Sequence, residues 1–252
     1  MSTLMVSISG IRGVIGKSLT PQIISKYILA FASYLNGGTV IVGRDSRVSG
    51  PFVSNIVKGC LVASGCKVID IGIVPTPTVQ LAIEYHKAAG GIAITASHNP
   101  IQWNGLKFMG SDGRFLNPEK AGKVYEMADR DEQTLKTWDG LGSEEMDDQA
   151  NQRHIESVLN LSLVDADAIR AKKYKVVIDT VNGAGGFIIP QLLESLGCKV
   201  TTINEEANGK FAHTPEPLPE NLTQLSDKVR EVGADVGFAG SRARGRRSRF
   251  GA

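Results

Sequence analysis

A serine, a histidine and an asparagine follow one another where an apolar run ends, and this cluster is the first feature of the sequence that could do chemistry. Residues 92–96 have the composition of a central strand, and Ser97, His98 and Asn99 come directly after them. In open α/β sheets, ligands bind beyond the carboxyl ends of the strands. A nucleophilic serine needs a nearby base and positive charge, which His98 and Lys107 could supply. The alternative is a polar turn, because Ser, Asn and Pro are common in loops.

Two further segments carry arginines among small residues. In "SGIRGVIG" (9–16), three glycines surround Arg12 and could present backbone N–H groups and a guanidinium to an anion, although a plain turn has the same composition. In "GRDSRVSG" (43–50), Arg44 and Arg47 flank Asp45. These arginines could bind an anion, or Asp45 could hold one of them in an ion pair. We favour the structural interpretation for this second segment.

Strand-like and helix-like segments alternate along the chain, which predicts an α/β fold. The apolar stripe of residues 51–64 is typical of an amphipathic helix between strands. The pattern of residues 61–72, a helix stopped by Gly and followed by Cys-Lys-Val, returns at 192–204. We therefore expect two tandem α/β/α layer domains with mixed sheets, the second incomplete at its C-terminal end. The expected ranges are 1–140 for the first domain, 141–153 for an acidic linker, 154–239 for the second domain and 240–252 for an Arg-rich, disordered tail.

The composition is that of an ordinary globular protein, with 42% hydrophobic and 21% charged residues. The formal net charge of +2 comes from the tail, because residues 240–252 contain five arginines and no acid, and the remainder carries a net charge of −3. The three cysteines lack metal-ligand spacing and are expected to be packing residues in a reducing, cytoplasmic setting. The sequence predicts no membrane span.

These motifs, in this order, resemble the α-D-phosphohexomutase family, which includes phosphoglucomutase, phosphomannomutase and phosphoglucosamine mutase. The resemblance covers about residues 4–239 and is carried by "GIRG", "GRDSR", "PTPT", "TASHNPIQWNGLK" and "HTPEPLPENL". The Ser-His-Asn-Pro motif followed by Asn-Gly-x-Lys is its most specific part. "VSISGIRG" also loosely resembles phosphoglucosamine mutase-like members, but the sequence does not choose among the hexoses.

The resemblance implies that Ser97 carries a phosphoryl group and exchanges it with a hexose phosphate through a hexose bisphosphate intermediate. It implies that Lys107 is the general acid/base, that His98 assists proton transfer or orients the sugar, and that Arg12 stabilises the transferring phosphate. Asn99 belongs to the same substrate-binding motif. A Mg²⁺ ion is expected to bind the phosphate on Ser97.

One part of the family pattern is missing. In the family, the strand equivalent to residues 233–239 leads into Asp-x-Asp-x-Asp-Arg, which holds the Mg²⁺, whereas this chain reads "GSRARGRRSRFGA". The carboxylate ligands are therefore absent, and the family's third and fourth domains do not follow. We expect a truncated mutase fragment with little or no activity, and we hypothesise a reading-frame shift or a sequence artefact after about Ala239.

Three further expectations follow from this interpretation. A non-catalytic module that binds phosphosugars or a protein partner is the alternative function. The exposed edge of the second domain could promote self-association, and the oligomeric state is left open. The Arg-rich tail could bind nucleic acid, but we do not favour this because it has little aromatic interleaving and the body is net acidic.

Overall fold

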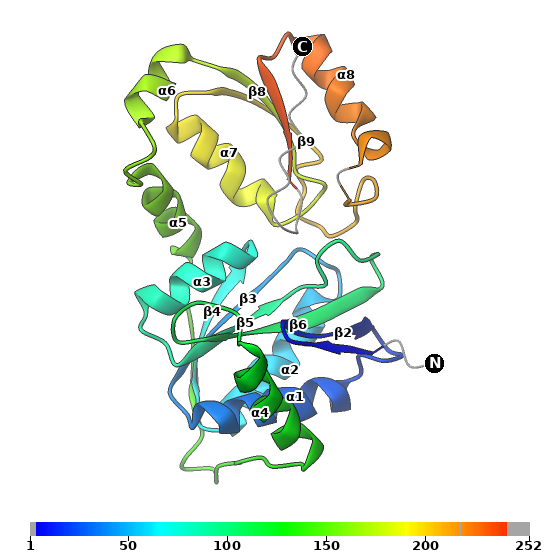
Figure 1. Ribbon diagram of the computed structural model, residues 1–252, viewed down its shortest axis with the longest axis vertical. Helices are drawn as coiled ribbons and strands as arrows, with labels where there is room; N and C mark the ends of the chain where they lie inside the picture. The colour runs from blue at the N-terminus through cyan, green and yellow to red at the C-terminus, as the bar shows by residue number, and fades with distance from the viewer. Residues whose placement is uncertain (1–3, 217, 241–252) are drawn as a thin grey trace. The chain divides into compact units, whose positions relative to one another are not determined.

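The computed structural model describes residues 4–216 and 218–240 of the chain (Figure 1). These residues form two compact units: the first comprises residues 4–96 and 102–150, and the second comprises residues 97–101 together with the described residues from 151 onward. Each unit is an α/β structure, as the sequence predicts. Among the described residues, no helix has both the length and the apolar character that a membrane crossing requires.

The first unit is built on a seven-stranded mixed sheet with the strand order β1-β2-β6-β5-β3-β4-β7. Neighbouring strands are antiparallel from β1 through β2 and β6 to β5, and parallel from β5 through β3 and β4 to β7. The strands are β1 (Met5–Ser7), β2 (Gly10–Val14), β3 (Thr39–Arg44), β4 (Lys67–Ile73), β5 (Gly90–Ile94), β6 (Trp103–Gly110) and β7 (Ser143–Met146).

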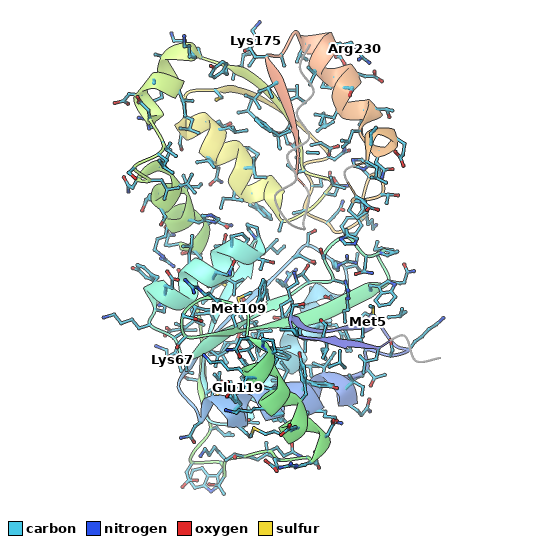
Figure 2. All side chains as sticks on the ribbon, in the orientation of Figure 1. Met5, Lys67, Met109, Glu119, Lys175 and Arg230 are labelled. Carbon is cyan, nitrogen blue, oxygen red and sulfur yellow. The ribbon has the colours of Figure 1, made fainter. Side chains whose placement is uncertain are left out.

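Four helices cover the two faces of this sheet. Helices α1 (Pro21–Leu35), α2 (Gly50–Ala63) and α4 (Pro118–Asp129) pack on one face, around a core that includes Phe31 and Phe108. Helix α3 (Thr76–Tyr85) packs on the opposite face. Met109, labelled in Figure 2, is fully buried in this second core.

Short-range chemistry fixes where the helices begin. Thr20 precedes α1, and its side chain accepts a hydrogen bond from the backbone of Ile23. Asn117 caps α4 in the same way, at 2.8 Å from the Lys120 nitrogen, and a proline follows each cap. Such caps satisfy N–H groups that the first helical turn leaves without partners.

Two strands of this unit differ from the sequence-based expectations. The segment around Arg12 is not a glycine-rich loop but strand β2, whose backbone pairs with β1 and β6. Residues 143–146, inside the range interpreted as a linker, form strand β7 along β4. All four residues of β7 are exposed, and Glu144 and Glu145 form ion pairs with Lys58 and Lys67. An exposed edge strand has no apolar alternation, so its sequence resembles a linker.

The second unit has a three-stranded sheet in the order β10-β8-β9. The three described strands are parallel to one another. Helix α8 packs closely on β8 and β10. A Cβ atom added to Gly237 of β10 would lie only 2.7 Å from the Val229 side chain of α8, so this close packing requires a glycine. The elements are α5 (Ala150–Leu159), α6 (Ala166–Lys172), β8 (Lys175–Asp179), α7 (Gly185–Ser195), β9 (Lys199–Ile203), a 3₁₀ turn (Pro219–Asn221), α8 (Thr223–Val232) and β10 (Val236–Ala239).

Strand β10 lies at one edge of the described sheet, next to β8 alone. The residues of β10 are buried or half-buried, and both the exposure of this edge and the self-association inferred from it stay predictions. The expected Arg-rich tail, its binding arm and the frame shift fall on residues 241–252, which lie outside the described residues. The three cysteines are unpaired, and Cys66 is buried, as expected for packing residues.

Candidate functional site

The predicted nucleophile lies in the loop that joins β5 to β6. Ser97 is buried and has a left-handed backbone conformation, with φ at 58°. A residue with a side chain adopts this conformation only at a cost of about 1–3 kcal/mol, and such strain is concentrated at functional sites. The Ser97 Oγ and the His98 Nδ1 are 3.4 Å apart, and His98 itself is exposed. The structure therefore brings these two predicted residues together; Asn99 follows, half-buried.

Both ends of this loop are attached to the sheet of the first unit. The Thr95 N–H donates to the Gly105 carbonyl at 2.9 Å, just after β5 ends. At the other end, the Gln102 carbonyl accepts from the Ile15 N–H at 3.0 Å. Because the loop is short and tethered at both ends, its range of positions is limited.

Arg12 and Lys107 lie on the same face of the sheet, on the adjacent strands β2 and β6. Arg12 pairs with Gly105, and Lys107 is two residues further along β6, so the alternation of the strand places both side chains on one face. Diagonal neighbours of this kind have Cα atoms about 7–8 Å apart. Gly105 contributes no side chain between them, and a Cβ there would lie 2.5 Å from the Ile11 carbonyl oxygen. The face therefore carries two cations, with Met5 of β1 opposite Arg12 and Ala93 of β5 opposite Lys107.

The Lys107 ammonium lies 5.5 Å from the centre of the Phe115 ring. A cation over an aromatic face is attracted to the ring, and the contact limits the positions of a flexible lysine. Lys107 lies directly opposite Ala93 of strand β5, and the small alanine side chain leaves room beside the lysine.

In segment 43–50, the structure confirms the interpretation that Asp45 holds an arginine in an ion pair. Arg47 is fully buried and its Nε lies 3.4 Å from the Asp45 Oδ2. The Arg44 Nη1 donates to the Asp45 carbonyl at 3.2 Å. A fully buried guanidinium cannot bind a ligand that arrives from solvent, so Arg47 is a structural residue.

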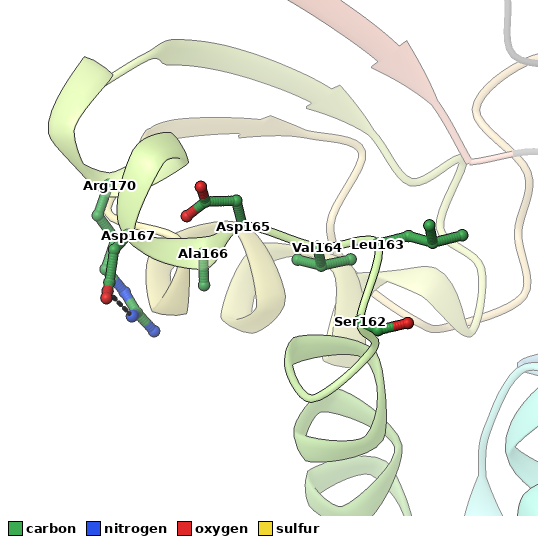
Figure 3. Close-up of a pocket in the computed structure, with 7 residues that line it drawn as sticks. All are labelled: Ser162, Leu163, Val164, Asp165, Ala166, Asp167 and Arg170. Atoms are coloured by element: carbon green, nitrogen blue, oxygen red, sulfur yellow. Dashed lines mark hydrogen bonds and ion pairs between the residues drawn. The ribbon is translucent and has the colours of Figure 1, made fainter.

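A pocket lies elsewhere, in the second unit, and Figure 3 shows that its lining comes from the segment around the start of α6. Its charged groups already have partners: Arg170 forms an ion pair with Asp167 at 2.8 Å, and Asp165 accepts from the Ala168 N–H. None of the predicted site residues lines it. The lining residues are Ser162, Leu163, Val164, Asp165, Ala166, Asp167 and Arg170.

Sequence reasoning missed a histidine–carboxylate pair in the second unit. The Asp179 side chain is fully buried at the end of β8, and its Oδ2 lies 2.8 Å from the His213 Nε2. Burial raises the pKa of Asp179, but hydrogen bonds from His213, Asn204 and the Val181 N–H outweigh it, so the pKa is lowered overall. The hydrogen bond to Asp179 raises the pKa of His213, against a smaller effect of burial. Thirty-four residues separate the partners, so no local pattern signals the contact.

Two further histidines, His86 and His154, are half-buried. The His86 Nε2 lies 2.7 Å from the Asp147 Oδ2. Burial lowers the pKa of His154. Both residues therefore support packing within their own units.

Two family models match the chain. The first is described as phosphoglucomutase/phosphomannomutase, alpha/beta/alpha domain I, and covers residues 4–135. The second is domain II of the same family and covers residues 152–240. The chain belongs to the phosphoglucomutase/phosphomannomutase family. Its α/β fold, expected from the sequence, is thereby confirmed.

Curated relatives in this family agree with the match. A probable phosphoglucosamine mutase of Methanopyrus kandleri is 40% identical over 92% of this chain and 50% of its own length. A phosphoglucomutase/phosphomannomutase of Thermococcus kodakarensis is 39% identical over 91% of this chain and 51% of its own length. The chain thus spans about half the length of the curated relatives it matches.

The solved structures of the family show the same fold. A putative phosphomannomutase from Thermus thermophilus superposes with a TM-score of 0.82 at 29% identity, over 95% of this chain and 55% of that one. A family member from Burkholderia thailandensis gives a TM-score of 0.76, also at 29% identity, over 93% of this chain and 53% of that one.

The expected Mg²⁺ site stays a prediction. Within residues 4–216 and 218–240, no group of three or more His, Cys, Asp or Glu side chains is placed to hold a metal ion. The segment in which the metal-binding motif is expected lies beyond β10, in residues that the structure does not describe.

Proposed function

We propose that this chain carries the phosphoserine half of a phosphohexose mutase, with Ser97 as the residue that holds the phosphoryl group. The observation that supports this most directly is the pair of cations, Arg12 and Lys107, on one face of the strands that anchor the Ser97 loop. Phosphoryl transfer requires positive charge around the equatorial oxygens of the moving group. A short tethered loop and a cationic sheet face supply the two parts that the reaction needs.

In the proposed reaction, a hydroxyl of a hexose phosphate attacks the phosphorus on Ser97. The new bond between the sugar oxygen and phosphorus forms as the bond between Oγ and phosphorus breaks, which leaves a hexose bisphosphate. Lys107 acts as general acid and base: its ammonium gives a proton to the Ser97 Oγ as that oxygen leaves, and the resulting amine takes the proton of the attacking hydroxyl. Arg12 stabilises the charge on the transferred group. The reverse sequence, after the sugar turns over, returns the other phosphate to Ser97.

His98 and Asn99 are proposed to orient the sugar or assist proton transfer. The contact of 3.4 Å between Ser97 Oγ and His98 Nδ1 is long for a hydrogen bond between two such groups, so it supports a positioning role more than activation of the serine. The expected Mg²⁺ on the Ser97 phosphate and the cytoplasmic location stay predictions.

The substrate is proposed to be a glucose, mannose or glucosamine phosphate. Several relatives carry the name probable phosphoglucosamine mutase, and another is named phosphoglucomutase/phosphomannomutase. The names of the relatives do not choose among these hexoses. The expectation that this chain turns over little or no substrate rests on residues 240–252 and remains a prediction.

The test separates phosphorylation from turnover. Wild type and Ser97→Ala are incubated with glucose 1,6-bisphosphate or glucosamine 1,6-bisphosphate, and intact mass reports whether one phosphoryl group is gained. A coupled mutase assay on the same samples reports turnover. Phosphorylation of wild type alone supports the proposal, with or without turnover. Binding of hexose phosphate with no phosphorylation would instead support the non-catalytic module.

A further inference from the structure

The segment that follows β3 contacts the first end of the Ser97 loop. The Asp45 N–H donates to the carbonyl of Ile94 at 3.0 Å. Ile94 is the last residue of β5, three positions before Ser97. Asp45 therefore extends the parallel pairing of β3 and β5 by one hydrogen bond and fixes the point at which the chain leaves the sheet.

The same segment contacts the other end of the loop. The Arg47 Nη1 donates to the carbonyl of Trp103, the first residue of β6, at 2.8 Å. Two residues further on, the Ser49 hydroxyl accepts from the Asn104 Nδ2 at 2.9 Å. The fully buried Asn104 uses its Oδ1 to accept from the Gly105 N–H at 2.8 Å. These contacts define the point at which the chain returns to the sheet.

Internal contacts make this segment rigid. The Arg47 N–H donates to the Asp45 Oδ1 at 2.8 Å, and the Gly50 N–H donates to the Arg47 carbonyl at 2.7 Å. The Arg47 side chain has no exposed surface, and that of Asp45 is 6% exposed. Burying such a pair is costly, and an apolar pair of the same volume is often as stable. The pair is therefore better explained by the geometry it imposes than by the stability it adds.

We propose that Asp45 and Arg47 are positioning residues that hold both ends of the Ser97 loop at fixed points of the sheet. We call residues 44–50 the loop clamp. With both ends fixed, the loop retains the left-handed conformation at Ser97, which a free chain would abandon. This inference rests on the proposed function of Ser97, because it assigns the clamp to the presentation of that hydroxyl for phosphoryl transfer.

Arg47→Lys tests the clamp, because lysine keeps the charge but lacks the planar fork that reaches Asp45 and Trp103 together. Loss of a buried hydrogen bond from a charged group corresponds to about a tenfold to hundredfold change in local opening. We expect the amides of Asp45 and Thr95 to exchange faster with solvent by that factor. Phosphorylation of Ser97 by glucose 1,6-bisphosphate should slow at least tenfold at saturating bisphosphate, as loss of geometry lowers kcat more than it raises KM.

A milder variant and a matched control accompany it. Ser49→Ala removes only the contact with Asn104, so it tests the clamp even if Arg47→Lys folds poorly. Lys58→Met is the control, because Lys58 forms ion pairs with Asp70 of β4 at 2.7 Å and with Glu144 of β7, and neither partner belongs to the clamp. It should lower the melting temperature without changing exchange at Asp45 and Thr95.

The outcomes separate the clamp from the function it serves. Faster exchange at the loop ends and slower phosphorylation in Arg47→Lys or Ser49→Ala, but not in Lys58→Met, support the clamp. Unchanged exchange in both clamp variants, or an equal effect in Lys58→Met, would overturn it. If wild type itself is not phosphorylated, the proposed function fails, and the exchange data still decide whether the loop is held.

Discussion

The buried pair of Asp179 and His213 makes the stability of the second unit depend on pH in a defined direction. The His213 Nε2 faces the Asp179 Oδ2 and its Nδ1 faces the Thr214 carbonyl, each at 2.8 Å. Both nitrogens face acceptors, and both can donate only when the ring is protonated. The pKa of His213 is raised and that of Asp179 is lowered, as expected for an ion pair within the fold.

Because the pKa of His213 is raised in the folded state, its contribution to the free energy of unfolding is complete below about pH 6.5, the pKa of histidine in an unfolded chain. This contribution is lost as the pH rises through the pKa of His213 in the folded state. The lowered pKa of Asp179 means that its stabilisation is complete above about pH 3.9 and is lost as pH falls through the folded value. The pair should therefore be most stabilising between these limits. Over the upper transition, the free energy of unfolding should fall by at most about 1.4 kcal/mol per pH unit.

His213→Gln replaces the charged donor with a neutral one of similar reach. A hydrogen bond to a charged group contributes about 1.5–3 kcal/mol, and Asp179 keeps its bonds from Asn204 and the Val181 N–H. We expect His213→Gln to lower the free energy of unfolding by about 2 kcal/mol at pH 5.5. At pH 9 the difference from wild type should be smaller, because His213 has then lost its charge in wild type.

Urea unfolding at a series of pH values, followed by a signal from the second unit, measures this difference directly. The comparison must be between wild type and variant at each pH, because the lowered pKa of His154 acts in the opposite direction. His98→Gln is the matched control, since His98 is exposed and should leave the profile unchanged. A difference between wild type and His213→Gln that stays constant from pH 5.5 to pH 9 would refute a charged His213.

Three further predictions concern the Ser97 loop and the strands that anchor it. Ser97→Gly should be more stable to urea than Ser97→Ala by about 1 kcal/mol, since only glycine adopts a φ of 58° without strain; equal midpoints would contradict the left-handed conformation. Gly10→Ala should lower the melting temperature sharply, because a Cβ there would overlap the Leu106 carbonyl oxygen. Gly16→Ala is the milder comparison, because Gly16 has a positive φ but open space around it. Equal losses of melting temperature in the two variants would argue against the close approach of β2 and β6. Lys107→Met should slow phosphorylation of Ser97 by about 10²–10⁴-fold with an unchanged melting temperature, and an unaltered rate would exclude it as the general base.

The sequence predicted those elements whose local pattern matches their environment. Strand β5 is a buried apolar run, and helix α2 has a clear apolar stripe, so both were found close to their observed bounds. Strand β2 was missed because its glycines are typical of a loop, although they are required where β2 and β6 approach closely. Strand β7 was missed because an edge strand with four exposed residues carries no apolar signal.

The candidate site was predictable in part. Ser97 and His98 are adjacent in the sequence, so their contact needed no fold. That Arg12 and Lys107 share a face follows only from the pairing of β2 with β6, which local patterns do not give. The contact between His213 and Asp179 depends on a loop that returns to the end of β8, and the role of Arg47 depends on a carbonyl 56 residues away. Such contacts are set by topology, which periodicity does not encode.

The central claim is that Ser97 accepts and donates a phosphoryl group, and one measurement tests it most directly. The purified 252-residue chain is incubated with glucose 1,6-bisphosphate, and the phosphorylated residue is located by peptide mass spectrometry. Our account predicts one phosphoryl group, on Ser97, that is lost again when glucose 1-phosphate is added in excess. A folded chain that gains no phosphoryl group, or gains it on another residue, would contradict the account.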